Sequence, residues 1–177
     1  MKDPIPLRPT RDEDIPAITA IYADSVLTGT ASYEIDPPDE DEMQRRHRDI
    51  AGRGFPHLVA ERDGTILGYA YAGPYRPRPA YRYTVEDSIY VARDARGLGI
   101  GRSLLAALIE RCETLGFRQM IAVIGGGTEH PASVALHLSL GFREIGLIEG
   151  SGFKHGRWLD TVLMQRALGE GRATLPE

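Results

Sequence analysis

The sequence predicts an α+β domain in which helices flank a mixed, mostly antiparallel sheet. Signals for antiparallel strands dominate the first half of the chain, and the second half alternates strand, helix, strand, helix and strand. A chain of 177 residues with 42% hydrophobic content can bury one core but not two. We therefore expect a single domain over residues 1–177, with its core at about residues 5–167.

The first predicted elements are a short strand and two helices. The strand is the apolar "IPLRP", and residues 29–56, which carry Arg45, Arg46 and Arg48, predict a solvent-exposed second helix followed by the loop "GRGFP". Between them, "TRDEDIPAITAIYADSV" predicts the first helix, because its apolar residues recur at helical spacing: Ile15, Ile18, Tyr22 and Val26.

A hairpin and a charged strand come next. "HLVAE" and "ILGYAYAG" surround an Asp63-Gly64 turn, which is a strong hairpin signal. The proline-rich "YRPRPAYRY" predicts an irregular loop. "TVEDSIYVA" is rich in strand-forming residues, but Glu86 and Asp87 place carboxylates on both of its faces, and charges there need a reason.

The remaining elements alternate. A glycine-rich loop leads into a helix that Gly116 ends, and "QMIAVI" is a compact strand. "PASVALHLSL" predicts a short helix between Pro131 and Gly141, and "FREIGLI" and "RWLDTVLMQ" are the final strands. The long helix has one apolar face, which includes a cysteine as a small core residue: Ile100, Leu104, Leu105, Leu108, Ile109 and Cys112.

Composition narrows the function classes. A net charge of −4 without a basic stripe argues against a nucleic-acid partner. No apolar run approaches the roughly 18 to 20 residues that cross a bilayer, so we expect no membrane partner. The single Cys112 is typical of a cytoplasmic protein. Five histidines without paired-ligand spacing predict no metal site, and His47 and His57 are expected at the surface.

The stretch "RGLGIGRS" is the strongest functional signal. Its glycines allow a tight turn and close approach of a ligand, so backbone amides and the helix dipole form an anion site suited to a pyrophosphate. Arg96 and Arg102 add positive charge. The stretch departs from a dinucleotide-binding GxGxxG loop, because position 102 is arginine, and it lacks the Gly-Lys-Ser/Thr of a P-loop.

Three residues of this stretch, Arg96, Gly99 and Gly101, match the RxxGxG signature of the GNAT acetyltransferases, and the chain resembles that superfamily. Within it, "YAGPYRPRPAYRYTVEDSIYV", "SVALHLSLGF" and "FKHGRWLDTVLMQR" are similar to the phosphinothricin and methionine sulfoximine acetyltransferase group, from about Ile5 to Met164. The resemblance implies the GNAT (acyl-CoA N-acyltransferase) fold, acetyl-CoA as co-substrate, direct transfer in a ternary complex, a small-molecule amino-acid acceptor and a homodimer.

The resemblance also implies which residues bind the coenzyme. The signature loop holds the pyrophosphate, and backbone amides at 89–91 polarise the thioester oxygen. Similar enzymes place asparagine three residues before a serine, whereas this sequence has His130 before Ser133. The implied coenzyme-binding residues are Ile89, Tyr90, Val91, Arg96, Gly97, Leu98, Gly99, Ile100, Gly101, Arg102, Ser103, His130 and Ser133.

Two residues are candidates for proton transfer. By resemblance, Glu86 runs beside the acetyl group and acts as general base or as anchor for the amino group; the alternative is an ordinary ion pair with Arg82 or another arginine of the loop. His137 stands four residues after Ser133, where many GNAT enzymes have the tyrosine that donates a proton to the thiolate. The alternative for His137 is a satisfied core histidine.

The acceptor is expected to be an amino acid, because guanidinium groups are natural partners of a carboxylate and "YRPRPAYR" carries three of them. Solvated loop charges are the alternative. Tyrosines supply walls, and Lys154 and His155 come from the last hairpin or from a partner subunit. The candidate acceptor-binding residues are Tyr33, Tyr75, Arg76, Pro77, Arg78, Tyr81, Arg82, Glu86, Asp87, Ser88, Lys154 and His155.

Three functions remain open at this stage. The first is acetylation of the α-amino group of a small amino acid or an analogue such as phosphinothricin, methionine sulfoximine or methionine sulfone. The second is acetylation of protein N-termini or lysines, which requires an open groove. The third is acetyl-CoA sensing without turnover, which the presence of Glu86 and His137 argues against.

Overall fold

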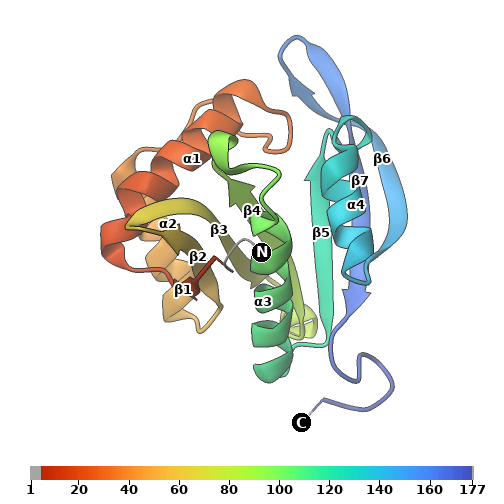
Figure 1. The fold of residues 1–177 in the computed structure, drawn as a ribbon. Helices are drawn as coiled ribbons and strands as arrows, with labels where there is room; N and C mark the ends of the chain where they lie inside the picture. Colours follow the sequence, from red (N-terminus) through yellow and green to blue (C-terminus); the bar gives the residue numbers. More distant parts are fainter. Residues whose placement is uncertain (1–4, 177) are drawn as a thin grey trace.

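Seven strands form one sheet in the order β1-β2-β3-β4-β5-β7-β6 (Figure 1). The computed structural model describes residues 5–176. The strands and helices are β1 (Leu7–Pro9), α1 (Ile15–Thr28), α2 (Glu40–Gly52), β2 (His57–Arg62), β3 (Thr65–Pro74), β4 (Thr84–Val91), α3 (Ile100–Thr114), β5 (Gln119–Gly125), α4 (Pro131–Ser139), β6 (Arg143–Lys154) and β7 (Arg157–Ala167).

The sheet is mixed and mostly antiparallel, as predicted. Every neighbouring pair of strands in the described chain is antiparallel except β4 and β5, which run parallel. The predicted hairpin turn lies between β2 and β3, where Asp63 and Gly64 have φ angles of 51° and 76°. Two consecutive positive φ values give the backbone twist that suits a two-residue hairpin turn.

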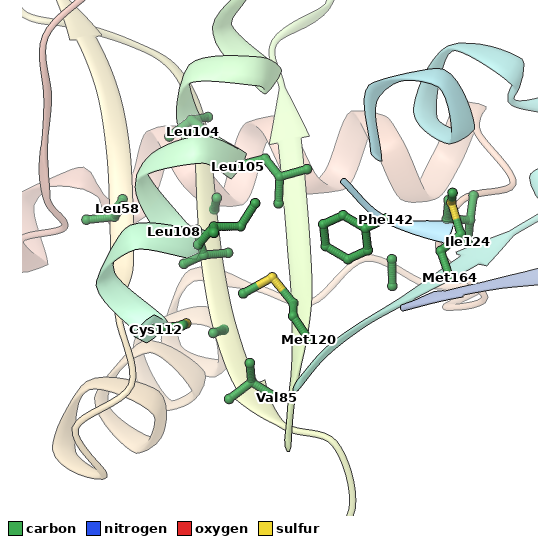
Figure 2. Packing of buried hydrophobic residues seen from close by; sticks show 14 of the residues in the cluster. Leu58, Val85, Leu104, Leu105, Leu108, Cys112, Met120, Ile124, Phe142 and Met164 are labelled. Carbon is green, nitrogen blue, oxygen red and sulfur yellow. The ribbon is translucent and has the colours of Figure 1, made fainter. Parts of the chain in front are cut away.

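One face of the sheet packs against α3. Leu104, Leu105 and Leu108 of this helix are fully buried against strand residues such as Val85 and Met120 (Figure 2). Cys112 lies in the same core, where burial raises the pKa of its thiol to about 12. It is therefore a small core residue, as predicted, and its sulfur is not a nucleophile.

The opposite face packs against α1 and α2. The predicted stripe of α1 is buried there together with Met43 of α2 and with Val59 and Tyr69 of the sheet. Because successive side chains of a strand point to opposite faces, Leu58 belongs to the α3 core and Val59 to this one. Among residues 5–176, no helix has the length and apolar content needed to cross a bilayer.

Two expectations from the sequence were wrong. The strand predicted from "FREIGLI" continues to Lys154, because β6 pairs with β7 along a long hairpin that includes two irregularities of register. His47 and His57 are not at the surface: His47 is 8% exposed, and the His57 ring stacks on Tyr69 and Tyr71. The burial of His47 was not evident from the sequence, because most residues of α2 are charged and only one narrow face of this helix packs against the sheet.

Candidate active site

β4 and β5 diverge near the middle of the sheet. They pair only as far as Glu86 opposite Ile121, although β4 continues to Val91 and β5 to Gly125. The divergence opens a cavity of about 250 Å³ between the strands. Its walls come from both strands, from the α1–α2 connection and from α4: Ala31, Tyr33, Glu86, Asp87, Ser88, Ile89, Tyr90, Ala122, Val123, Ile124, Gly125, Ser133 and His137.

The cavity lies between the two faces of the sheet. Alternation along β4 sends Asp87 toward α4, where it contacts His137, and sends Tyr90 toward α1, where its ring centroid lies 4.9 Å from that of Tyr22. Glu86 shares the face of Tyr90. Two molecules can therefore meet in the cavity from opposite sides of the sheet, one along α3 and α4 and the other beneath the α1–α2 connection.

The glycine loop lies at the start of α3. Gly97 and Gly99 have φ angles of 75° and 82°, and a Cβ on either would meet no atom within 4 Å. Glycine is therefore required by the left-handed backbone, and the space beside the loop is open. The first amides of α3, which begins at Ile100, have no partner within the helix. Open space, free amides and the helix dipole fit a pyrophosphate.

The two arginines of the loop differ in their surroundings. Arg96 is exposed and makes no ion pair with any described residue, so its guanidinium is available to an anion. Arg102 instead donates to the Ser139 side chain (2.6 Å) and backbone oxygen at the end of α4. Ser103 is exposed in the first turn of α3. A contact of Arg102 with pyrophosphate stays a prediction, because its guanidinium already joins α3 to α4.

Glu86 has the electrostatics of a base that works near neutral pH. Burial and the nearby charge of Asp87 raise the pKa of its carboxyl to about 7. The alternative ion pair with Arg82 is not formed: the Arg82 guanidinium lies over the Tyr83 ring, and no described residue pairs with Glu86. An unpaired, half-buried carboxyl in a cavity is typical of a functional residue.

His137 is buried and both of its ring nitrogens are engaged. Its Nε2 lies 2.9 Å from Asp87 Oδ2, and its Nδ1 lies 2.8 Å from the Ser133 carbonyl oxygen. Burial disfavours the charged ring, but the hydrogen bond and charge of Asp87 outweigh it and raise the pKa of His137. A carbonyl can only accept, so Nδ1 carries hydrogen and Nε2 is the nitrogen that exchanges a proton with Asp87.

Asp87 has one oxygen to spare. Its side chain is 2% exposed, and its Oδ1 has no hydrogen-bond partner among the described residues. A buried, unpaired carboxylate oxygen is costly unless a ligand or a proton satisfies it. The sequence signalled the charge on β4 but not the pairing with His137, because 50 residues separate the two side chains.

The predicted acceptor residues fall into two groups. Tyr33, Glu86, Asp87 and Ser88 line the cavity. The residues of the 75–83 loop do not: they form their own cluster, in which the exposed Arg76 guanidinium lies 5.1 Å from the ring centroid of the half-buried Tyr75 and 5.7 Å from that of the half-buried Tyr81. Pro77, Arg78 and Arg82 are exposed as well. Carboxylate binding by these arginines stays a prediction.

The remaining predicted residues contact the α1–α2 connection. Lys154 is buried and donates from Nζ to the Ser32 carbonyl oxygen at 2.8 Å. His155 Nε2 lies 3.3 Å from the Gly29 carbonyl oxygen, and His130 Nε2 lies 2.7 Å from Thr30 Oγ1. All three side chains therefore act within one chain as contacts for residues 29–32.

Apart from Tyr33, which was a candidate wall residue, the sequence did not reveal the role of this connection. Ala31 lines the cavity, and a Cβ on Gly125 would lie 2.7 Å from its carbonyl oxygen and 2.8 Å from the Tyr33 ring. A Cβ on Gly126 would lie 2.6 Å from Thr30 Oγ1. The run of three glycines after β5 was a usable signal, because consecutive glycines mark close approach of another backbone.

Comparison with known proteins agrees with this geometry. Residues 12–142 match the model of the Acetyltransferase (GNAT) family. The chain is 57% identical to the phosphinothricin N-acetyltransferase of Alcaligenes faecalis over 97% of this chain and 86% of that protein. It is 44% identical to the L-methionine sulfoximine/L-methionine sulfone acetyltransferase of Pseudomonas aeruginosa over 90% and 92% of the two chains.

A solved structure is similar along nearly the whole chain. The crystal structure of a phosphinothricin acetyltransferase from Sinorhizobium meliloti in complex with acetyl-CoA superposes with a TM-score of 0.95 at 56% identity. The match covers 98% of this chain and 93% of that one.

Proposed function

This chain belongs to the GNAT family of acetyltransferases, and we propose that it transfers the acetyl group of acetyl-CoA directly to the α-amino group of a small amino acid or analogue in a ternary complex. The observation that carries the proposal is one cavity that joins an unpaired carboxyl, Glu86, to a buried histidine–carboxylate pair beside an open glycine loop.

Acetyl-CoA is the co-substrate, and when bound it supplies the acetyl group as a thioester. The first amides of α3 and the free guanidinium of Arg96 hold its pyrophosphate. Along β4, residues 87–91 pair with β3 on one edge only, so the other edge directs backbone N–H groups into the cavity. Those donors stabilise negative charge that develops on the thioester oxygen.

Glu86 removes a proton from the acceptor's ammonium group, directly or through one water. A carboxyl with a pKa of about 7 is ionised in a large fraction of molecules at neutral pH and is still basic enough to accept a proton. Deprotonation gives the neutral amine that attacks the carbonyl carbon. The half-buried position excludes water from Glu86, and this loss of hydration keeps the pKa of its carboxyl high.

His137 and Asp87 return a proton to the sulfur. Both partners of the His137 ring are acceptors, so a ring with hydrogen on both nitrogens satisfies all three groups, with Asp87 ionised. When a thiolate leaves, the Nε2 hydrogen moves to sulfur, whose parent thiol has a pKa near 8.5. The neutral ring that remains takes up a proton from the solvent that enters the cavity, which His137 lines.

The acceptor class is a free α-amino acid with a polar tetrahedral sulfur or phosphorus centre in its side chain. Relatives named for phosphinothricin and for methionine sulfoximine and sulfone support this class. A site that hydrogen-bonds such oxygens disfavours plain methionine, because its thioether leaves those groups unsatisfied at about 1–3 kcal/mol each.

Free-thiol release from acetyl-CoA over a panel of acceptors tests the proposal. We expect kcat/KM for methionine sulfone, methionine sulfoximine or phosphinothricin to exceed that for methionine by at least about 10-fold. Equal efficiency on methionine and its sulfone would overturn the acceptor class. Activity confined to peptide N-termini or lysines would favour the protein-acetylating alternative, and acetyl-CoA binding without turnover would favour a sensor.

A homodimer in the cytoplasm completes the proposal. Phe153 and Trp158, at the end of the β6–β7 hairpin, are 58% and 70% exposed, and their rings contact each other edge to face. Large exposed aromatic side chains are typical of interface centres. Light scattering over a range of concentrations distinguishes a dimer from a monomer, and Trp158→Ser should shift the mass toward that of one chain.

A further inference from the structure

Residues 29–34, between α1 and α2, form a bridging segment across the open part of the sheet (Figure 1). It contacts the N-terminal half through Tyr22 with Ser32 and Arg46 with Glu34, and its other long-range hydrogen bonds go to the C-terminal half of the chain. Tyr33 Oη lies 2.7 Å from Thr161 Oγ1 and accepts from the Gly126 amide at 3.2 Å. The bridging segment therefore joins the two halves that β4 and β5 leave apart.

The bridging segment is also a wall of the cavity. Ala31 and Tyr33 line it from the side of α1 and α2, the face on which Glu86 lies. This is the side opposite the glycine loop and α4. Residues that fix the bridging segment should therefore influence the acceptor more than the coenzyme.

His130 fixes the bridging segment at its start. The His130 Nε2–Thr30 Oγ1 distance is 2.7 Å, and Thr30 is 6% exposed. The contact spans 100 positions of sequence, and it lies directly beside the close approach of Thr30 to Gly126. The Thr30 side chain fits there only because Gly126 has no Cβ, and the hydrogen bond from His130 holds the Thr30 hydroxyl in that place.

We propose that His130 is a positioning residue for the acceptor, which acts through Thr30 and the bridging segment, and is not a coenzyme contact. The inference rests on the proposed function, since it assigns one side of the same cavity to the acceptor. His130 stands at the N-cap of α4, but its side chain caps no helix amide and its Nε2 is engaged with Thr30.

Three substitutions of His130 test the assignment. His130→Gln places a side-chain nitrogen near the former Nε2 and should keep the hydrogen bond, whereas His130→Ala removes it and His130→Asn is too short to reach Thr30. We expect His130→Ala and His130→Asn to raise the acceptor KM about 3- to 10-fold with the acetyl-CoA KM unchanged, and His130→Gln to restore a value near wild type.

The partner residue gives an independent variant. Thr30→Val keeps the side-chain volume and removes the hydroxyl, so it should raise the acceptor KM by the same factor. The double variant Thr30→Val/His130→Ala should be no worse than either single one, because both remove one interaction. Thr114→Val, which removes an exposed hydroxyl at the end of α3, is the matched control and should leave both KM values unchanged.

Amide hydrogen exchange separates this inference from the acceptor assignment. If the panel above shows no turnover at all, faster exchange across residues 29–34 in His130→Ala and Thr30→Val, with wild-type exchange in His130→Gln, still supports the hydrogen bond. A raised acetyl-CoA KM in His130→Ala with an unchanged acceptor KM would overturn the proposal. Unchanged KM values and unchanged exchange in a folded His130→Ala would overturn it as well.

Discussion

Two histidines lie on opposite faces of this sheet, and their pKa values are shifted in opposite directions. His137 lies on the α4 side of the divergent strands, against Asp87, and its pKa is raised. His57 lies beside a cavity of about 210 Å³ beneath α1 and α2, where burial and then the neighbouring His47 lower its pKa to about 3. The two rings are the same chemical group; His137 is buried and His57 is half-buried.

The difference comes from the partners. Around His57, the Tyr69 and Tyr71 rings stack on the imidazole and Thr10 Oγ1 lies 2.7 Å from Nδ1, so its close contacts are neutral. The negative charge of Asp14 raises the pKa of His57, but this effect is smaller than the lowering by burial. His137 instead faces a carboxylate in direct contact. A buried histidine therefore keeps a proton only where the fold also buries a negative charge, and only such a site can transfer one.

The largest expected effect is a loss of turnover when proton-transfer residues between the divergent strands β4 and β5 are replaced. Glu86→Gln and His137→Ala should each lower kcat about 100- to 10,000-fold, because each removes a group that moves a proton. Calorimetry should show nearly unchanged acetyl-CoA affinity in both. His57→Phe is the matched control from the other region and should keep kcat within about 2-fold. Wild-type turnover in both Glu86→Gln and His137→Ala would mean that Glu86 and His137 are structural residues.

Asp87→Asn sharpens the comparison by making the surroundings of His137 resemble those of His57. Without the carboxylate, burial outweighs the remaining hydrogen bond to the Ser133 carbonyl, so the pKa of His137 should fall below its usual value of about 6.5. We expect kcat to fall about 10- to 100-fold. Nuclear magnetic resonance titration of the histidine rings measures the shift, and an unchanged His137 pKa would contradict the role given to Asp87.

The pH dependence of turnover should follow Glu86. Glu86 works as a base only when ionised, and its pKa is about 7, so kcat/KM should rise as pH increases through that value. At higher pH, kcat/KM should fall again once His137, whose pKa is raised, loses the proton that it donates. Below pH 7 the expected decline is about 10-fold per pH unit. The acid limb should be absent from the residual activity of Glu86→Gln. An acid limb centred near 4.5, the usual value for glutamate, would show that Glu86 is solvated in the working enzyme.

Local sequence patterns predicted most of the fold. The Asp63-Gly64 turn, the apolar stripe of α1 and the glycine loop before α3 each depend on neighbours in sequence, and each is present. The glycine loop proposed to hold the coenzyme could be found for the same reason. The burial of His57 could not, because it depends on tyrosines from another strand and on a helix that the charged composition of residues 40–52 presents as solvated.

The side of the cavity that we assign to the acceptor was predicted least well. Its walls depend on contacts over long sequence separations, such as His130 with Thr30 and Tyr33 with Thr161. No periodicity links such residues. The arginines of the 75–83 loop gave the clearest sequence signal for a carboxylate site, yet they lie outside the cavity. Clustered charge indicates where a ligand can be attracted, but only the fold decides which side chains face it.

The smallest expected effect concerns His57 and is measured as the pH dependence of the free energy of unfolding, not as a rate. The pKa of His57 is about 3 in the folded protein and about 6.5 in the unfolded chain, so between these values the unfolded chain binds more protons. Stability from His57 is therefore present above pH 6.5 and is lost as pH falls. At pH 5 the loss is about 1–2 kcal/mol, and His57→Phe should not show it. Denaturant unfolding at pH 7 and pH 5 gives the change in stability between these pH values for wild type and for His57→Phe. Comparing the two changes cancels the pH-independent cost of losing the Thr10 contact. His155→Asn, which removes an exposed histidine at a φ of 50°, is the control. An equal loss in wild type and His57→Phe would show that His57 is protonated at little cost, and the contrast with His137 would then rest on Asp87 alone.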